Sequence, residues 1–293
     1  MFDYLIDKIL TAEFKVEPFE HIYIENFLDD GHLEEITGSH ELKIEADSTE
    51  KLFEELNDRN FHPIEFPGCT ISQKDYVKWE RGKDVSYKKS ETCESFGMVF
   101  RLKKAESLTV KKFVDFVENG GFFEALIKKF EISGSVSRDI GLQKYLNGYE
   151  ISPHPDTRRK ALTFMLNLNQ GASMDNEQVH THYCRLNPER EFISSFWDKN
   201  EELDRCWLPW DWVSTESYQK KNNSIVIFAP SSYSLHAVKL KYNHCASQRT
   251  QLYGNLWYED FKSLPVPSYQ DFDILNNVAS KTGKWVRRLL GDR

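Results

Sequence analysis

The chain has 293 residues, of which 40% are hydrophobic and 14% aromatic, so it is long and apolar enough to bury a sizeable core. Its net charge of -8 argues against a general nucleic-acid-binding protein, which needs a basic face to displace phosphate counterions. The five cysteines form no CxxC pair, so neither a zinc ribbon nor a disulfide framework is indicated. We expect a cytoplasmic protein without a membrane span, because no apolar stretch has the required length.

The first part of the chain, residues 1–135, is predicted to be mainly helical. Apolar residues recur at helical spacing over residues 2–10, and a short strand at 22–24 leads into a second helix. Ser107 is a plausible N-cap for a longer helix, which Gly120 and Gly121 interrupt before a further helical segment. We expect these helices to buttress a sheet through their aromatic side chains.

From residue 138 the hydrophobic period changes to that of strands. The runs IGLQKYL, ALTFMLNLN, SIVIFAP and QLYGNLWY are short, rich in aliphatic, aromatic and β-branched residues, and separated by turn residues. The predicted fold class is therefore α+β, a double-stranded β-helix (jelly roll) buttressed by the N-terminal helices. We expect one domain, with the core at 136–262, an insert at about 172–220, and a helical tail at 263–293.

The stretch ISPHPDT holds the first candidate metal ligands. His154 and Asp156 are two residues apart, so on an extended strand their side chains face the same way. A third ligand, His236, follows the strand SIVIFAP, 80 residues beyond Asp156. Two imidazoles and one carboxylate on one side of an ion form the facial triad typical of non-haem Fe(II) oxygenases.

Arg249 opens the last predicted strand, QRTQLYGNLWY, 13 residues after His236. A guanidinium binds a carboxylate through two parallel hydrogen bonds, so this position suits an anchor for the distal carboxylate of 2-oxoglutarate. Tyr145, nine residues before His154, is placed to add a phenolic hydrogen bond.

The ordered set of HxD, a distant His, and an Arg on the next strand resembles the Fe(II)/2-oxoglutarate-dependent oxygenases, most closely the prolyl-4-hydroxylase-like branch. FEHIYIENFLDDGHLEEI, YLNGYEISPHPDTRRKALTFMLNLN, SLHAVK and QRTQLYGNLWY resemble successive blocks of that branch. The resemblance implies an enzyme that uses Fe(II), 2-oxoglutarate and dioxygen to oxidise an unactivated C–H bond by hydroxylation, desaturation or cyclisation. Related halogenases have Gly or Ala at the acidic ligand, so Asp156 predicts no halogenation.

The substrate is left open by the sequence. A small amino-acid-derived metabolite is one hypothesis, with Arg158, Arg159 and Trp210 as candidate substrate-binding residues. Residues 195–218 hold four of the seven tryptophans, which would form either a wall of the site or a hydrophobic cluster that fixes a long loop. The alternatives are a peptidyl (prolyl-type) hydroxylase and a non-catalytic jelly-roll binding protein. No nucleic-acid or membrane partner is expected, and the oligomeric state is open.

A rival metal pair is His180 and His182, with Cys184 nearby. An HxH pair of the cupin type should be followed within a few residues by Glu, but Leu186 and Asn187 occupy those positions. The surrounding segment is polar and irregular, so we expect an exposed loop. Nothing in the sequence orients a base toward Cys184, so a plain thiol is expected there.

Overall fold

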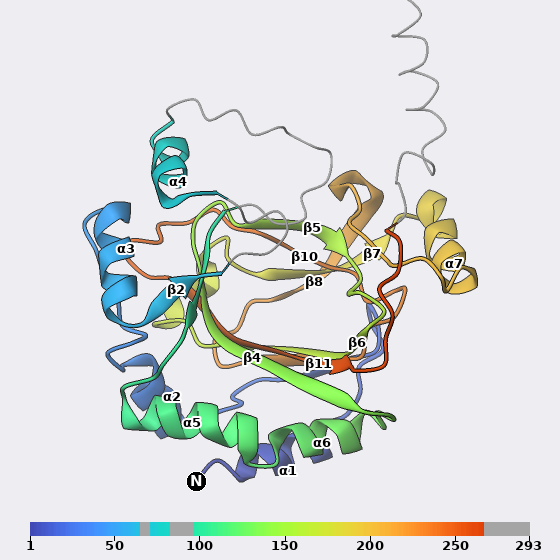
Figure 1. Ribbon diagram of the computed structural model, residues 1–293, viewed down its shortest axis with the longest axis horizontal. Coiled ribbons are helices and arrows are strands. Elements are labelled where there is room, and N and C mark those ends of the chain that lie inside the picture. Colours follow the sequence, from blue (N-terminus) through green and yellow to red (C-terminus); the bar gives the residue numbers. More distant parts are fainter. Residues whose placement is uncertain (65–70, 83–96, 267–293) are drawn as a thin grey trace, which may run out of the picture.

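The computed structural model describes residues 1–64, 71–82 and 97–266. Within these residues, two antiparallel sheets face each other and helices cover the outer side of the larger one (Figure 1). Most of the predicted C-terminal helical tail lies outside the described residues.

The larger sheet has seven strands in the order β1-β9-β6-β11-β4-β3-β2. The last strand of the described chain, β11, lies at its centre and pairs along ten residues with β4. The other edge of β11 pairs with β6. The strands are β1 (Ile22–Ile24), β2 (Phe61–Pro63), β3 (Val99–Leu102), β4 (Val136–Tyr145), β6 (Lys160–Asn167), β9 (Ile225–Phe228) and β11 (Arg249–Tyr258).

The smaller sheet has four strands in the order β5-β10-β7-β8. From β4 to β11 the chain passes back and forth between the two sheets, which is the connectivity of a double-stranded β-helix. The predicted fold class is therefore confirmed. The strands are β5 (Glu150–His154), β7 (Thr181–Leu186), β8 (Val213–Gln219) and β10 (His236–Lys239).

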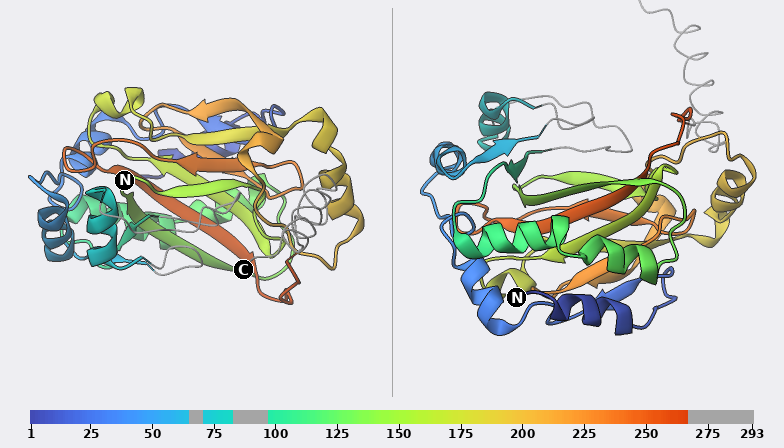
Figure 2. Two further views of the ribbon diagram at one scale, coloured as in Figure 1. Left: turned by 90° about the horizontal axis from the view of Figure 1, so that it is seen from above. Right: turned by 60° about the horizontal axis from the view of Figure 1, so that its bottom comes forward.

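The helices α1, α5 and α6 pack against the outer face of the large sheet (Figures 1 and 2). Alternation along β11 separates the two faces: Leu252 and Leu256 pack toward the helices, whereas Gln251 and Tyr253 face the small sheet. Gly121 has a φ of 90°, which allows the sharp break between α5 and α6. The helices are α1 (Tyr4–Thr11), α2 (Asp30–Thr37), α3 (Thr49–Asp58), α4 (Gln73–Glu80), α5 (Leu108–Asn119), α6 (Phe122–Lys129) and α7 (Phe192–Lys199).

The strand predicted at 22–24 is β1, and together with β2 and β3 it lies within residues 1–135 and extends the large sheet at its two edges. One boundary differs from the sequence-based expectation, that of the insert. The strands β7 and β8 lie within the expected insert and belong to the small sheet, so the excursion from the core is confined to residues 187–212. None of the helices in the described part of the chain combines the length and the apolar character needed to cross a membrane.

Candidate metal centre

The structure brings His154, Asp156 and His236 together between the two sheets. His154 ends β5 and His236 begins β10, and the two residues are direct partners in the antiparallel pairing of these strands. Their ring centroids lie 4.3 Å apart. One ligand atom from each of the three side chains lies within 4.8 Å of the others, and all three residues are buried.

Both imidazoles are oriented by the backbone. The Nδ1 atom of His154 lies 2.8 Å from the carbonyl oxygen of Ser152, and the Nδ1 atom of His236 lies 3.1 Å from that of Ser234. A carbonyl oxygen only accepts hydrogen bonds, so Nδ1 is the protonated nitrogen in each ring and Nε2 is left as a metal ligand. Burial lowers the pKa of His154 to about 3 and also lowers the pKa of His236, so both rings are neutral near pH 7.

The carboxylate of Asp156 is held at both oxygens. The ammonium of Lys160 lies 2.6 Å from Oδ1, and the hydroxyl of Thr163 donates to Oδ2 at 2.6 Å. Burial alone would raise the pKa of Asp156, but the Lys160 ammonium holds that pKa below its usual value, so the group is ionised. Two neutral imidazoles and one carboxylate fit a divalent first-row metal such as Fe(II), and three protein ligands leave positions for other ligands.

A cavity of about 340 Å³ opens beside these ligands, between the two sheets. The large sheet contributes Tyr253 and Trp257, the small sheet contributes Val238, and residues 205–207 of the excursion form a further wall. This volume is typical of sites for small molecules.

Arg249 lines the same cavity and has no carboxylate partner among the described residues. It lies opposite Tyr145 in the β4–β11 pairing, and its guanidinium carbon lies 4.5 Å from the centre of the Tyr145 ring. Its Nη2 donates to the hydroxyl of Thr181 at 2.9 Å, across the gap to the small sheet. The side chain is only 2% exposed, and a buried cation without a counter-ion is costly. Arg249 is therefore a strong candidate to receive an anionic ligand.

The other sequence-predicted site residues lie elsewhere and do not line this cavity. The guanidinium of Arg158 donates to backbone carbonyls of the excursion, at Trp197 and, at 2.7 Å, at Leu203. Arg159 is exposed and lies over the ring of Trp257, 4.5 Å from its centre. Trp210 donates from Nε1 to a carboxylate oxygen of Glu150 at 2.8 Å, on the outer side of the small sheet.

The sequence left open whether the four tryptophans of the excursion form a wall of the site or a hydrophobic cluster, and the structure shows both roles. Trp197 and Trp212 are buried in a separate hydrophobic cluster against the small sheet, with Trp210 packed at its border. Trp207 instead lines the cavity beside the metal ligands. The excursion is thus fixed by its own small core and contributes one aromatic wall to the site.

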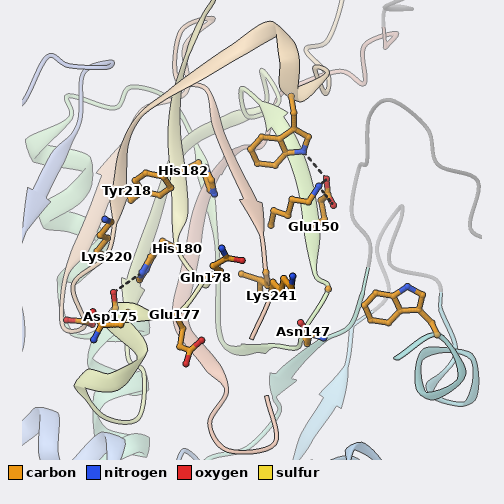
Figure 3. Close-up of a pocket in the computed structure, with 16 residues that line it drawn as sticks. Asn147, Glu150, Asp175, Glu177, Gln178, His180, His182, Tyr218, Lys220 and Lys241 are labelled. Atoms are coloured by element: carbon orange, nitrogen blue, oxygen red, sulfur yellow. Dashed lines mark hydrogen bonds and ion pairs between the residues drawn. The ribbon is translucent and has the colours of Figure 1, made fainter. Parts of the chain in front are cut away.

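The rival histidines face away from the cavity. His180 and His182 line a broad groove on the outer side of the small sheet, together with Tyr218 and Lys220 (Figure 3). His182 lies on β7 and packs against Tyr218, with ring centroids 4.6 Å apart, rather than in an exposed loop. In the described part of the chain, the only cluster of three potential metal ligands is that of His154, Asp156 and His236.

Sequence reasoning did not assign Lys160, Thr163 or Arg205 to the site, and it included Trp207 only as one of four tryptophans that would form either a wall of the site or a hydrophobic cluster. Lys160 is the first residue of β6, and the tight turn after Asp156 brings its ammonium back to that carboxylate. The separation of only four residues in the sequence is a signal from which this ion pair could have been predicted. Arg205 lies in a segment without periodicity, and no signal in the sequence marked it. The same lack of periodicity left open which of the four tryptophans reaches the cavity.

Comparison with known proteins finds distant structural similarities. No protein-family model matches the sequence, and no curated protein matches it. The chain is similar to a prolyl-4-hydroxylase from Pseudomonas putida at 11% identity and a TM-score of 0.41, over 88% of this chain and 100% of that chain. It is similar to a prolyl hydroxylase from Trichoplax adhaerens, solved with a peptide of hypoxia inducible factor, at 13% identity and a TM-score of 0.42, over 88% and 89% of the two chains.

A third similar structure is HygX from Streptomyces hygroscopicus, solved with nickel, 2-oxoglutarate and hygromycin B. The identity is 10% and the TM-score 0.38, over 88% of this chain and 87% of that chain. Because these similarities are distant, the function proposed below rests on the residues of this chain.

Proposed function

We propose that the protein is an Fe(II)/2-oxoglutarate-dependent dioxygenase that oxidises an unactivated C–H bond of a small molecule. The observation that carries this proposal is the combination, in one cavity, of a buried His-Asp-His ligand set and a buried arginine that has no carboxylate partner among the described residues. The first feature suits a ferrous ion, and the second suits the distal carboxylate of 2-oxoglutarate.

In the proposed enzyme, Nε2 of His154, Nε2 of His236 and the Asp156 carboxylate hold the metal. When bound, Fe(II) supplies the redox chemistry by which dioxygen oxidises the substrate C–H bond while 2-oxoglutarate is converted to succinate and carbon dioxide. Lys160 and Thr163 keep the carboxylate of Asp156 in one orientation, because each of its oxygens accepts a hydrogen bond.

The co-substrate is held at the part of the cavity that Arg249 lines. Arg249, braced by the Tyr145 ring and by Thr181, binds the distal carboxylate of 2-oxoglutarate. Apolar and aromatic side chains around the ligands, including Met165 and Trp257, exclude water from the reacting atoms. With Asp156 retained as a ligand, the product is an oxygenated, desaturated or cyclised compound and not a halogenated one.

A small-molecule substrate is favoured by the size of the cavity, because about 340 Å³ must hold both the co-substrate and the reacting part of the substrate. A peptidyl hydroxylase is the second candidate, and it would need only one side chain to enter the cavity. A non-catalytic binding protein is the third candidate. It predicts no turnover of 2-oxoglutarate.

The test is the release of succinate from 2-oxoglutarate by the Fe(II)-loaded protein in air. We expect slow release without added substrate, loss of this release on chelation of iron, and a loss of at least about 1,000-fold in His236→Ala. The matched control is His182→Ala, which removes a histidine from the opposite face of the same sheet. Iron-independent release, or equal release by His236→Ala, would contradict the proposal.

A further inference from the structure

A short segment of the excursion, residues 204–208, runs directly alongside the part of the chain that carries two of the metal ligands. The amide of Leu208 donates to the carbonyl oxygen of Pro153 at 2.7 Å. Four residues earlier, Oδ1 of Asp204 accepts from the amide of Arg158 at 3.1 Å. These contacts fix the segment at both ends, so its intervening side chains form a wall of the metal cavity rather than a free loop.

Three polar atoms on this side of the cavity are buried without a hydrogen-bond partner among the described residues: Nε of Arg205, Nε1 of Trp207 and Oγ1 of Thr157. All three residues line the cavity. A buried donor without an acceptor costs about 1–3 kcal/mol, and more when the group is charged. Three such donors beside one cavity indicate a ligand that supplies the missing acceptors.

The charges of the cavity point to the same conclusion. One of the Arg205 guanidinium nitrogens, Nη1, lies 3.5 Å from the backbone oxygen of Asp156, which places the cation next to a metal ligand. Burial and the neighbouring Arg158 lower the pKa of Arg205 to about 10, so the group stays charged near pH 7, although Asp198, Asp204 and Asp156 favour its charged form. None of these carboxylates makes an ion pair with it in the described part of the protein. The Asp204 carboxylate is already engaged by two backbone amides, at Arg158 and Arg205.

The remaining cations of the cavity have other assignments. Arg101 pairs with Asp139 at 2.9 Å, and Lys160 pairs with Asp156. Arg249 is taken by 2-oxoglutarate in the proposed function. Among the described residues that line the cavity, Arg205 is therefore the one cation without a carboxylate partner or another assignment.

We propose that Arg205, together with the indole N–H of Trp207 and the hydroxyl of Thr157, binds a carboxylate of the substrate. The substrate is then a small carboxylic acid, such as an amino acid or an amino-acid derivative, oriented by its carboxylate beside the metal. This inference rests on the proposed oxygenase function. One guanidinium without a carboxylate partner among the described residues, together with two further donors from Trp207 and Thr157, matches the charge and the two oxygens of a carboxylate better than the double charge of a phosphate monoester.

The probe is a panel of the 20 common L-amino acids and their N-acetyl derivatives, each paired with its primary carboxamide, plus phosphoserine as a phosphate arm. With the Fe(II)-loaded protein and 2-oxoglutarate, we expect at least one acid to stimulate succinate release, and its carboxamide to have a kcat/KM roughly 100-fold lower. Equal stimulation by acid and amide, stimulation by phosphoserine alone, or no acid that exceeds its amide would overturn the inference.

Variants separate this inference from the proposed function. For the stimulating acid, Arg205→Met lowers kcat/KM roughly 100-fold, and Arg205→Lys recovers part of the loss because it restores charge without the planar fork. Each variant's kcat/KM is compared with its own substrate-free succinate release and with the visible absorption band of its own anaerobic Fe(II)–2-oxoglutarate complex, and only the loss beyond any change in these readouts counts for the inference. These two readouts report on the metal and co-substrate alone.

The matched control is Arg190→Met, which removes another half-buried arginine of the same excursion, one that lies over Trp212 outside the cavity. It is expected to leave the stimulated rate within twofold. If Arg205→Met keeps the wild-type response to the acid, the carboxylate site is elsewhere even though the enzyme is an oxygenase. If the wild type itself lacks the absorption band and the succinate release, the proposed function fails first.

Discussion

The two arginines of the cavity are held in different ways. Arg249 opens the central strand of the seven-stranded sheet, is 2% exposed, and is braced by Tyr145 from the neighbouring strand and by Thr181 from the opposite sheet. Arg205 lies in an irregular segment that is tied to the core by hydrogen bonds at its ends, from the Leu208 amide to the Pro153 carbonyl and from the Arg158 amide to the Asp204 carboxylate. A group needed for every turnover is thus built into the rigid sheet, whereas the group assigned to substrate choice lies on a connection that tolerates change.

Replacing Arg249, the arginine on the central strand, is expected to impair the binding of 2-oxoglutarate alone. In Arg249→Met we expect the KM for 2-oxoglutarate to rise on the order of 1,000-fold, because the distal carboxylate loses its buried charge partner. Steady-state succinate release measured against 2-oxoglutarate concentration checks this, with Arg190→Met as the control. An unchanged KM would show that a different cation anchors the co-substrate.

Replacing Lys160, whose ammonium lies beside Asp156, tests how the metal ligands are stabilised. In Lys160→Met the carboxylate stays buried without its ammonium partner, so the metal-free protein is expected to lose about 3 kcal/mol of unfolding free energy. A saturating divalent metal replaces the lost charge and restores much of this stability, which urea unfolding with and without Mn(II) measures. Lys239→Met, which breaks an exposed pair with Glu150, should change stability by less than about 1 kcal/mol.

Removing the indole N–H of Trp207, which is assigned to the substrate carboxylate, is expected to have a smaller effect on the reaction. Trp207→Phe keeps the aromatic wall and removes one donor, so kcat/KM for the stimulating acid should fall about tenfold while the KM for 2-oxoglutarate stays constant. Trp210→Phe removes an indole N–H that is bonded to Glu150 on the outer side of the small sheet, and it should leave both constants unchanged. Equal losses in the two variants would point to a general packing effect.

The smallest expected change is at the brace of Arg249. Thr181→Val preserves the shape of the side chain and removes the hydroxyl that accepts from the guanidinium, so the KM for 2-oxoglutarate should rise about fivefold. Thr215→Val, which removes a hydroxyl next to His182 on the other face, provides the control. A rise in both variants would contradict a specific role for Thr181.

The sequence predicted the sheet-bound part of the site because its signals are local. His154 and Asp156 lie on one face at the end of a strand. Arg249 is the first residue of a strand whose alternating side-chain pattern can be recognised in the sequence. Their convergence with His236 follows from the jelly-roll connectivity, in which β5 and β10 are neighbours.

Other parts of the fold and of the cavity could not be predicted from the sequence, and the reasons are physical. β8 (Val213–Gln219) is mostly exposed and polar, so it lacks the apolar alternation by which strands are recognised. Arg205 and Trp207 are positioned by long-range backbone contacts such as that between Leu208 and Pro153, which leave no periodic pattern. Arg158 was a plausible substrate residue by proximity to Asp156, but its guanidinium is occupied by carbonyl groups of the excursion.

The most direct test of the metal centre is an anaerobic titration of the protein with Fe(II) in the presence of 2-oxoglutarate, followed by visible absorption. The account predicts a weak charge-transfer band that saturates at one iron per chain in the wild type and in His182→Ala, and that is lost in His236→Ala. A wild type without the band, or a His236→Ala variant that keeps it, would contradict the account.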